Sequence, residues 1–229
     1  MDKKIIIMKK FKSNTEFRNH YGEKKIFSQN GQDSFVLDYF EYKKNGTFLD
    51  IGANNGISLS NTYILEKEYD WTGICIEPIP ITFEKLDKNR NCIKLNIGIS
   101  NKNGKERFGF MEKSSKMLSG IIEDYHPKHL QRINKQLSDT NSNLTEIEIQ
   151  CYLIGDILEN YSINKIDYMN IDTEGSELRI LKTIDFEKIH IECMSIENNY
   201  NDKEQRQFII SKGYKLIGTL GGDEIFIKE

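Results

Sequence analysis

The sequence has few prolines and cysteines, and it lacks any long apolar run. Three prolines and 16 glycines in 229 residues exclude a collagen-like or low-complexity chain. The longest apolar runs, Ile5–Met8 and Cys151–Ile154, have only four residues. A membrane helix needs about 20 apolar residues, and a signal-peptide core needs roughly 7–15. We therefore expect a soluble, cytoplasmic protein with no export signal and no membrane span.

The four cysteines, Cys75, Cys92, Cys151 and Cys193, include no C-x-x-C pair. Each lies inside an apolar stretch that is typical of a buried strand. Free buried thiols in a reducing compartment explain this pattern better than a disulfide framework or a zinc site.

The charge is close to balanced, with 32 Lys and Arg against 35 Asp and Glu. A net charge of −3 argues against a general nucleic-acid binder, which carries a basic surplus. Residues 1–25 are an exception, with eight basic and three acidic residues. We interpret them as a solvated basic tail, with contact to an anionic surface as the alternative. Residues 26–229 are long enough for a single domain with a substantial core.

From residue 46 onward, short apolar runs alternate with helical patterns, which is typical of a parallel α/β sheet. We predict strands at 47–51, 73–76, 92–97, 166–172 and 190–196, and helices at about 57–68, after Pro80, after Gly175 and up to Lys212. The last two apolar segments, 214–219 and 224–228, flank a short glycine-bearing loop. Such a loop predicts an antiparallel hairpin at the end of the sheet.

Two segments do not fit this alternation. Residues 26–42 predict an N-terminal helix, and residues 105–151 form an insertion with a helix at 127–137. Leu130, Ile133 and Leu137 lie on one face of that helix and must dock somewhere.

The segment Asp50-Ile51-Gly52-Ala53-Asn54-Asn55-Gly56 follows the first predicted strand. Loops at the carboxyl ends of parallel strands bind ligands in open α/β sheets. The glycine spacing is neither the dinucleotide nor the phosphate-loop pattern, so the loop suits a ligand without a pyrophosphate. Ordinary turn chemistry is the alternative interpretation.

Glu77 ends the second predicted strand, 27 positions after Asp50. A carboxylate at this place can accept hydrogen bonds from both hydroxyls of a ribose. With the glycine loop, it favours a nucleoside ligand over a solvated surface acid.

Three carboxylates, Asp172, Glu174 and Glu177, follow the strand after the insertion. Their negative charges repel one another, so the cluster would suit a bound sulfonium cofactor, a bound metal ion or a role as general base. Glu177 is expected only to complement the next helix. Asp172 and Glu174 could hold Mg²⁺, but nothing in the sequence requires it, and we predict no metal site.

The strings FLDIGANNG, GICIEPIP, LNIGISNKNG and IDYMNIDTEGSELRIL occur in this order. Together they resemble the FkbM family of S-adenosylmethionine-dependent methyltransferases, over roughly residues 26–228. The segment SQNGQD, Ser28–Asp33, is similar to an N-terminal signature of one branch of that family. The resemblance implies a class I methyltransferase (Rossmann-like) α/β fold, with a seven-stranded, mostly parallel sheet, a C-terminal antiparallel hairpin and an insertion after the third strand.

The resemblance also implies roles for matching residues. The methionine part of the cofactor would contact Asp50, Gly52, Ala53, Asn54 and Gly56. Glu77 would hold the ribose, and Asn96 and Gly98 would lie near the adenine. Asp172 and Glu174 would face the methyl group and the acceptor, and Gln29 and Asp33 would contact substrate or cofactor. Many family members carry lysine where this chain has Asn170, which leaves the acid–base assignment open.

We therefore expect an S-adenosylmethionine-dependent O-methyltransferase that acts on a hydroxyl of a sugar, a glycan or another small molecule. A nicotinamide-dependent oxidoreductase and a non-catalytic binding scaffold are the alternatives. An alcohol acceptor must lose a proton, so a carboxylate or histidine should lie within reach. Among the histidines, His126 is the candidate base, and we interpret the others as surface residues. Residues 111–145 are expected to cover the acceptor as a mobile lid, with a homodimer contact through the 127–137 helix as the alternative.

Overall fold

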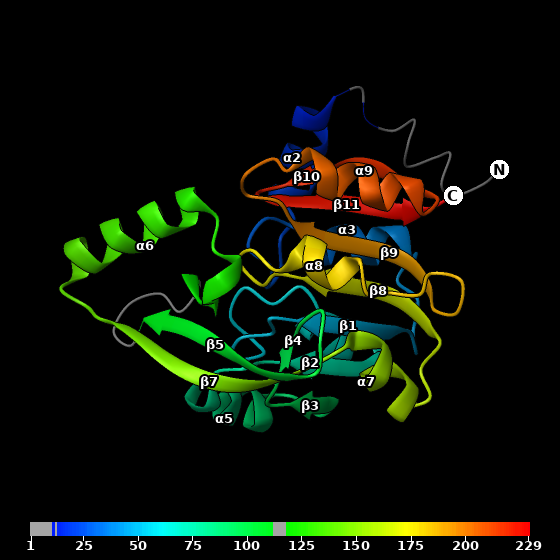
Figure 1. The fold of residues 1–229 in the computed structure, drawn as a ribbon. Coiled ribbons are helices and arrows are strands. Elements are labelled where there is room, and N and C mark those ends of the chain that lie inside the picture. The colour runs from blue at the N-terminus through cyan, green and yellow to red at the C-terminus, as the bar shows by residue number, and fades with distance from the viewer. Residues whose placement is uncertain (1–10, 12, 112–117) are drawn as a thin grey trace.

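The chain folds around a seven-stranded sheet in a computed structural model that describes residues 11, 13–111 and 118–229. The strand order is β10-β11-β9-β8-β1-β2-β3 (Figure 1). The strands are β1 (Thr47–Ile51), β2 (Thr72–Ile76), β3 (Ile93–Leu95), β8 (Lys165–Ile171), β9 (His190–Glu197), β10 (Tyr214–Leu220) and β11 (Asp223–Lys228). Strands β1, β2, β3, β8 and β9 pair in parallel, and β11 is antiparallel to both β9 and β10. The predicted mostly parallel sheet with a C-terminal hairpin is confirmed.

The strand order reverses between β1 and β8. The chain adds β2 and β3 on one side of β1 and then returns to place β8 and β9 on the other side. In open α/β sheets, the crevice outside the carboxyl ends of the strands at such a reversal is where ligands bind. The fold therefore predicts a site at the ends of β1 and β8.

Helices cover both faces of the main sheet. One face packs against α7 (Ile154–Asn160), α8 (Glu177–Leu181) and α9 (Lys203–Ser211), and the other against α2 (Asn14–Gly22), α3 (Gln32–Tyr39), α4 (Tyr63–Tyr69) and α5 (Pro80–Asn89). Figure 1 shows α8 and α9 in front of the sheet and α3 behind it. Side chains alternate between the faces, so Leu49 packs with the first set and Phe48 with the second.

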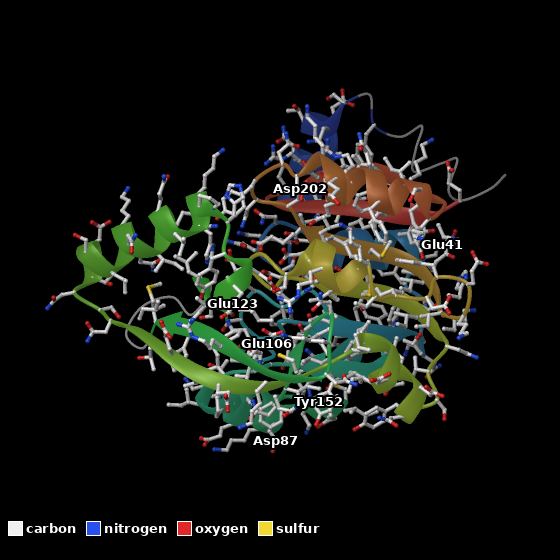
Figure 2. All side chains as sticks on the ribbon, in the orientation of Figure 1. Glu41, Asp87, Glu106, Glu123, Tyr152 and Asp202 are labelled. Atoms are coloured by element: carbon white, nitrogen blue, oxygen red, sulfur yellow. The ribbon has the colours of Figure 1, made fainter. Side chains whose placement is uncertain are left out.

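The insertion forms a smaller sheet of its own, in the order β4-β7-β5-β6. Its elements are β4 (Gly98–Ile99), β5 (Gly104–Met111), β6 (Gly120–Ile121), the short helix η2 (Ile122–Asp124), α6 (Pro127–Thr140) and β7 (Leu144–Tyr152). Arg179 of α8 ties this sheet to the main body, since its guanidinium donates to Glu106 at 2.6 Å and to Asp124 at 2.7 Å. Figure 2 labels Glu106 near the middle of the molecule, while α6 extends outward in Figure 1.

The apolar face of α6 packs within its own chain. Ile133 is buried with Met111, Leu118 and Tyr125, and Leu137 packs on the same cluster. Leu130 is the exposed member of the predicted stripe. The lid expected over 111–145 includes residues 112–117, which lie outside the described part of the chain.

The N-terminal predictions need correction. Residues 14–22 are not a solvated tail: Ser13 caps helix α2, whose Phe17 and Tyr21 are each 1% exposed against Phe35. The rest of the basic segment, residues 1–10 and 12, lies outside the described part. The helix expected over 26–42 is only α3, because the Asp33 carboxylate accepts the backbone N–H groups of residues 26–28 and folds them into a turn.

The helix expected at 57–68 begins later, at Tyr63. Asn55 accepts the backbone N–H groups of Ile57 and Ser58, and Ser60 accepts that of Tyr63. Such side-chain bonds compete with helix formation.

Helix α7 was not predicted at all. All four cysteines are free and buried, as expected. No helix of the described residues combines the length and the apolar character that crossing a bilayer requires.

Candidate active site

A cavity of about 260 Å³ opens at the carboxyl ends of β1, β2, β8 and β9. Its lining comes from widely separated segments, including the loop after β1, the end of β2, the insertion sheet, the turn after β8 and the β10–β11 hairpin. The cavity therefore lies where the strand order reverses, and it runs from the end of β2 across β1 and β8 to an acidic end at β9 and β11.

Asp50, Gly52, Ala53 and Asn54 line the cavity beside the turn after β8. Gly52 has φ +89°, and a Cβ placed there would lie 1.9 Å from the carbonyl oxygen of Asp172. Only glycine permits both this conformation and this approach. The backbone N–H groups of Gly52 and Ala53 both donate to Ile76 O at 3.0 Å. The loop is thus fixed between β2 and β8, where it lines the cavity.

Gly56, also predicted to contact the cofactor, is not among the cavity-lining residues. A Cβ there would lie 2.7 Å from side-chain atoms of Leu86 and Arg90. Its lack of a side chain lets α5 pack against the end of the loop.

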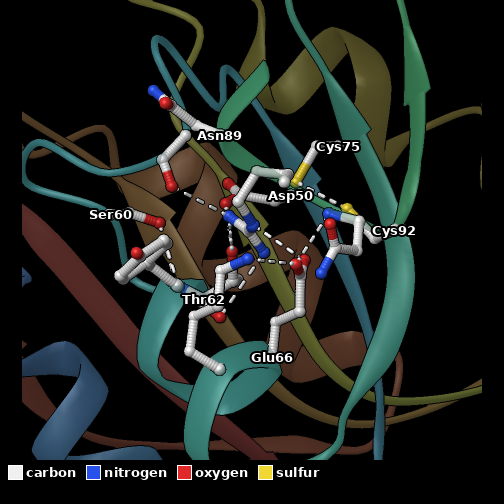
Figure 3. Close-up of polar contacts among 12 residues, drawn as sticks. Asp50, Ser60, Thr62, Glu66, Cys75, Asn89 and Cys92 are labelled. Atoms are coloured by element: carbon white, nitrogen blue, oxygen red, sulfur yellow. Dashed lines mark hydrogen bonds and ion pairs between the residues drawn. The ribbon is translucent and has the colours of Figure 1, made fainter. Parts of the chain in front are cut away.

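Arg90 sits beneath this loop and is 1% exposed. Its guanidinium donates to Gly56 O, to the Thr62 hydroxyl and to Glu66, and Thr62 in turn donates to Asp50 at 2.6 Å (Figure 3). Burial acts to raise the pKa of Glu66, but Arg90 and a backbone N–H bring it below its usual value. The second oxygen of Asp50 accepts from Asn170 at 3.0 Å. Asp50 is therefore a buried anchor of the loop, with both oxygens already bonded.

Glu77 lines the cavity at the end of β2 and is 5% exposed. Its Oε1 accepts from Ile79 N at 2.8 Å. Asn96 does not line the cavity; its amide donates to the carbonyls of Glu77 and Pro78 and so supports the strand end from behind.

Gly98 lines the cavity beside an apolar wall. That wall is formed by Ile79 of the main body together with Phe108, Ile121 and Ile149 of the insertion sheet. The insertion therefore completes the side of the cavity next to Glu77.

Four carboxylates line the cavity from the turn after β8 to β9 and β11: Asp172, Glu174, Glu197 and Asp223. Asp172 is exposed within the cavity, but the surrounding protein and the charges of Asp223 and Glu174 raise its pKa above the usual value. The pKa of Glu197 is raised well above its usual value by burial and by Asp172. Burial also raises the pKa of Asp223 to about 6, against the hydrogen bonds it accepts from Gln32 and Ser195. The negative charges of these acids repel one another, so each carboxylate disfavours ionisation of its neighbours.

Oxygens of Asp172, Glu174 and Glu197 lie within 4.8 Å of one another, a spacing that a metal ion could use. Glu174 Oε2, however, is already 3.4 Å from Arg132 Nη1 and 3.2 Å from His129 Nδ1. Because the Arg132 guanidinium already faces this carboxylate, we assign no metal ligand here.

The turn that carries these acids is tightly constrained. Glu174 has φ +59° and Gly175 φ +137°, so a glutamate adopts the left-handed conformation that usually favours glycine. Glu177 Oε1 accepts from the Thr173 N–H and hydroxyl at 2.8 Å, and Glu177 Oε2 accepts from Gly175 N at 3.0 Å. Glu177 thus holds the turn and does not line the cavity.

The N-terminal signature reaches the acidic end through two glutamines. Gln29 lines the cavity, as does Gln32, whose amide donates to Asp223 at 2.8 Å. Asp33 does not; it is fully buried and organises the preceding turn. Sequence reasoning selected Asp33 and missed Gln32, although both belong to the same motif.

The histidines are placed differently from our expectation. His126 caps α6, accepts from Lys128 N, and stacks on Tyr200 with 4.4 Å between ring centroids. It is not among the cavity-lining residues. His129, which we interpreted as a surface residue, is fully buried behind Glu174. His129 lies four residues before Ile133, so both share the buried face of the helix, and this spacing could have revealed its burial.

Comparisons with known proteins agree with the sequence motifs. The model of the methyltransferase FkbM domain matches residues 50–216. No curated protein sequence matches the chain. Similar solved structures include a methyltransferase FkbM from Methylobacillus flagellatus KT, at 12% identity and a TM-score of 0.46, covering 93% of this chain and 58% of that one. The METTL16 methyltransferase domain has 13% identity and a TM-score of 0.45, covering 93% of this chain and 76% of that one. A methyltransferase from Pyrococcus furiosus has 14% identity and a TM-score of 0.40, covering 94% of this chain and 97% of that one.

Proposed function

The chain belongs to the FkbM methyltransferase family, and from this premise we propose that it transfers a methyl group from S-adenosylmethionine to a hydroxyl group. The observation that carries the proposal is the single cavity that joins a glycine-lined loop and a buried strand-end glutamate to a cluster of carboxylates. One end suits a nucleoside cofactor, and the other suits a polar acceptor.

The residues present fit this cofactor. The loop Gly52–Asn54 lines the cavity and would contact the methionine part. Glu77 offers a buried carboxylate for the ribose hydroxyls, and the wall of Ile79, Phe108 and Ile149 offers an apolar surface for the adenine. A cofactor bound in this way would extend from β2 toward β8 and bring its sulfonium near Asp172.

When bound, S-adenosylmethionine supplies a methyl group whose bond to sulfur breaks as the acceptor oxygen attacks. The chain's own task is to hold the acceptor in line with that bond and to receive its proton. We assign proton acceptance to Asp172. Its raised pKa makes it a stronger base than an ordinary aspartate once it is ionised. Glu174, next to Arg132, is the neighbouring charge that orients the hydroxyl.

The acceptor end supports a polyhydroxylated substrate. Carboxylates share it with the carboxamides of Gln29, Gln32, Asn61 and Asn199. Groups of these two kinds bind hydroxyls through multiple hydrogen bonds. We therefore propose a sugar, a glycan or a similar small molecule as the acceptor, handled in the reducing cytoplasm that the four free cysteines favour.

Calorimetric titration tests the cofactor before any acceptor is known. S-adenosylhomocysteine, the product form, should bind with a one-to-one stoichiometry, and NAD should give no heat of binding. Binding of NAD alone would overturn the proposal in favour of an oxidoreductase. A panel of sugars assayed with radiolabelled S-adenosylmethionine would then identify the hydroxyl-bearing class.

A further inference from the structure

Asp223, at the start of β11, lines the cavity with only one of its two carboxylate oxygens bonded to the protein. The residue is 9% exposed. Its Oδ2 accepts from the Gln32 carboxamide at 2.8 Å and from the Ser195 hydroxyl at 3.3 Å. Its Oδ1 accepts a hydrogen bond from no residue that the structure describes. One oxygen is therefore anchored, and the other is available to a ligand.

The groups whose charges act on Asp223 bring no positive charge. They are Tyr168 of β8, Asp172 and Glu174 of the turn after β8, Glu177 of α8 and Glu197 of β9. Arg132 is the single cation among the described residues that line the cavity, and it faces Glu174 at 3.4 Å. A buried carboxylate is costly without a cation to pair with it. The acidic end therefore favours a positively charged ligand.

The proposed cofactor would not neutralise this end by itself. Its sulfonium would lie near Asp172, which follows β8, whereas Asp223 begins β11, with β9 between the two strands. Neighbouring strands lie about 4.8 Å apart, so the main chains of β8 and β11 are roughly 10 Å apart. Oxygens of Asp172, Glu174 and Glu197 form one close group, and Asp223 is outside it. Asp223 therefore remains for the methyl acceptor.

A second acceptor atom on a cavity-lining residue also lacks a donor. Asp50 accepts on both oxygens, from Thr62 at 2.6 Å and from Asn170 at 3.0 Å. Asn170 must therefore turn its amide nitrogen toward Asp50 and its oxygen toward Asn61, whose Nδ2 donates to it at 2.7 Å. This direction leaves Asn61 Oδ1, on a residue that is 8% exposed, without a partner in the described part of the chain. Two separate residues thus favour a ligand that donates hydrogen bonds.

A protonated amine brings both the positive charge and the N–H donors, and it has no acceptor of its own. A neutral hydroxyl would give a weaker hydrogen bond to a carboxylate and no charge. We propose that the acceptor carries an ammonium group, as an amino sugar does, and that this group binds Asp223 Oδ1. Gln32 is then a positioning residue, through which the N-terminal signature Ser28–Asp33 orients the carboxylate. The term acceptor rests on the proposed function, whereas the binding of an amine does not.

NMR titrations with matched sugars test the charge of the ligand without any methyl transfer. The probes are glucosamine, glucose and N-acetylglucosamine, added near neutral pH with EDTA, in the presence and absence of S-adenosylhomocysteine. Glucosamine should bind at least roughly tenfold more tightly than the two uncharged sugars, because only it pairs a cation with the carboxylate. The preference should shrink in high salt. Equal affinity for glucosamine and glucose, or no binding of glucosamine, would overturn the proposal.

Asp223→Asn separates recognition of the amine from a structural role. Gln32 and Ser195 both donate to Oδ2, so the asparagine places its oxygen there and turns its amide nitrogen, a donor, toward the ligand. The affinity for glucosamine should fall at least roughly tenfold, to that for glucose, while the affinity for glucose changes little. A loss of affinity that is equal for both sugars would indicate a structural role and refute the assignment.

Gln32→Leu tests the positioning of the carboxylate. It keeps the charge of Asp223 but removes one of the two donors that hold Oδ2, so the preference for glucosamine should fall by a smaller factor than in Asp223→Asn. Gln207→Leu, on the exposed side of α9, is the matched control and should keep the wild-type preference. A wild-type preference in Gln32→Leu would exclude positioning by Gln32. Selective binding of glucosamine without methyl transfer to any sugar would contradict the proposed function and support the amine site.

Discussion

Asn170 Nδ2 lies 3.0 Å from Asp50 Oδ1 and joins the ends of β8 and β1 by a neutral hydrogen bond. The position is one where the resemblance leads us to expect lysine. Here the charge of Asp50 is balanced from the other side, by Arg90 acting through Thr62. Asn170 Oδ1 also accepts from Asn61 Nδ2 at 2.7 Å, so one carboxamide serves two buried partners.

Replacing Asn170 with leucine should lower the free energy of unfolding by about 1–3 kcal/mol, because Asp50 and Asn61 each lose a buried partner. Urea denaturation measures this. Asn160→Leu, at the exposed end of α7, is the control and should change stability by less than about 0.5 kcal/mol. Equal effects of the two substitutions would show that the Asn170 bonds contribute nothing.

Glu77→Gln should weaken S-adenosylhomocysteine binding by about 1–3 kcal/mol, since hydrogen bonds to a charged acceptor are lost while the side-chain shape is kept. The amide oxygen can still accept from Ile79 N, so the thermal midpoint should stay close to that of the wild type. Calorimetry provides the affinity, with Glu84→Gln on the exposed side of α5 as the control. An affinity that Glu77→Gln leaves unchanged would remove Glu77 from the cofactor site.

Gly52→Ala should destabilise the fold and abolish cofactor binding. The added Cβ would meet the Asp172 carbonyl at 1.9 Å, and φ +89° is a conformation that alanine adopts only at a cost. Gly155→Ala is the matched control, because a Cβ there has nothing within 4 Å and the residue lies in α7. That variant should gain roughly 0.5–1 kcal/mol. Thermal denaturation of both proteins decides the prediction, which fails if Gly52→Ala melts like the wild type.

Asp223→Asn should make stability less dependent on pH. The pKa of Asp223 rises from 3.8 to about 6 on folding, so its stabilising contribution is present in acid and is lost as the pH rises through about 6. The asparagine keeps an acceptor for Gln32 and Ser195 but never ionises. Above this range the variant should therefore be more stable than the wild type by up to about 3 kcal/mol.

Urea denaturation at several pH values between 4 and 8 measures the effect of Asp223→Asn. Asp139→Asn, on the exposed side of α6, should leave the pH profile as it is. If stability changed with pH by the same amount in Asp223→Asn as in the wild type between pH 4 and 6, the assigned direction would be contradicted.

The main sheet was predictable because buried parallel strands have apolar residues on both faces and so appear as short apolar runs. Strand β1 matches its predicted range, Thr47–Ile51, and the final hairpin follows from Gly221–Asp223. Helices α2 and α7 were missed because they are short, with nine and seven residues. Their packing on the sheet, rather than their own periodicity, stabilises them.

The candidate site was predictable only where its residues are close in sequence. Asp50–Asn54, Glu77 and the Asp172–Glu174 turn each follow a recognisable strand. Glu197 and Asp223 meet them from later strands that carry no local signature. Similarly, the choice between His126 and His129 depends on where α6 begins: the cap residue turns outward, and the residue three positions later turns inward.

The backbone contact between Gly52 and Asp172 has a consequence for how this protein can change over evolutionary time. The spacing between the β1 loop and the turn after β8 depends on main-chain atoms, with Asp172 N bonded to Ile51 O at 3.0 Å. Substitutions around the cavity rim can accumulate without altering that spacing. Side chains at the rim are therefore free to change while the contact between the β1 loop and the turn after β8 stays constant.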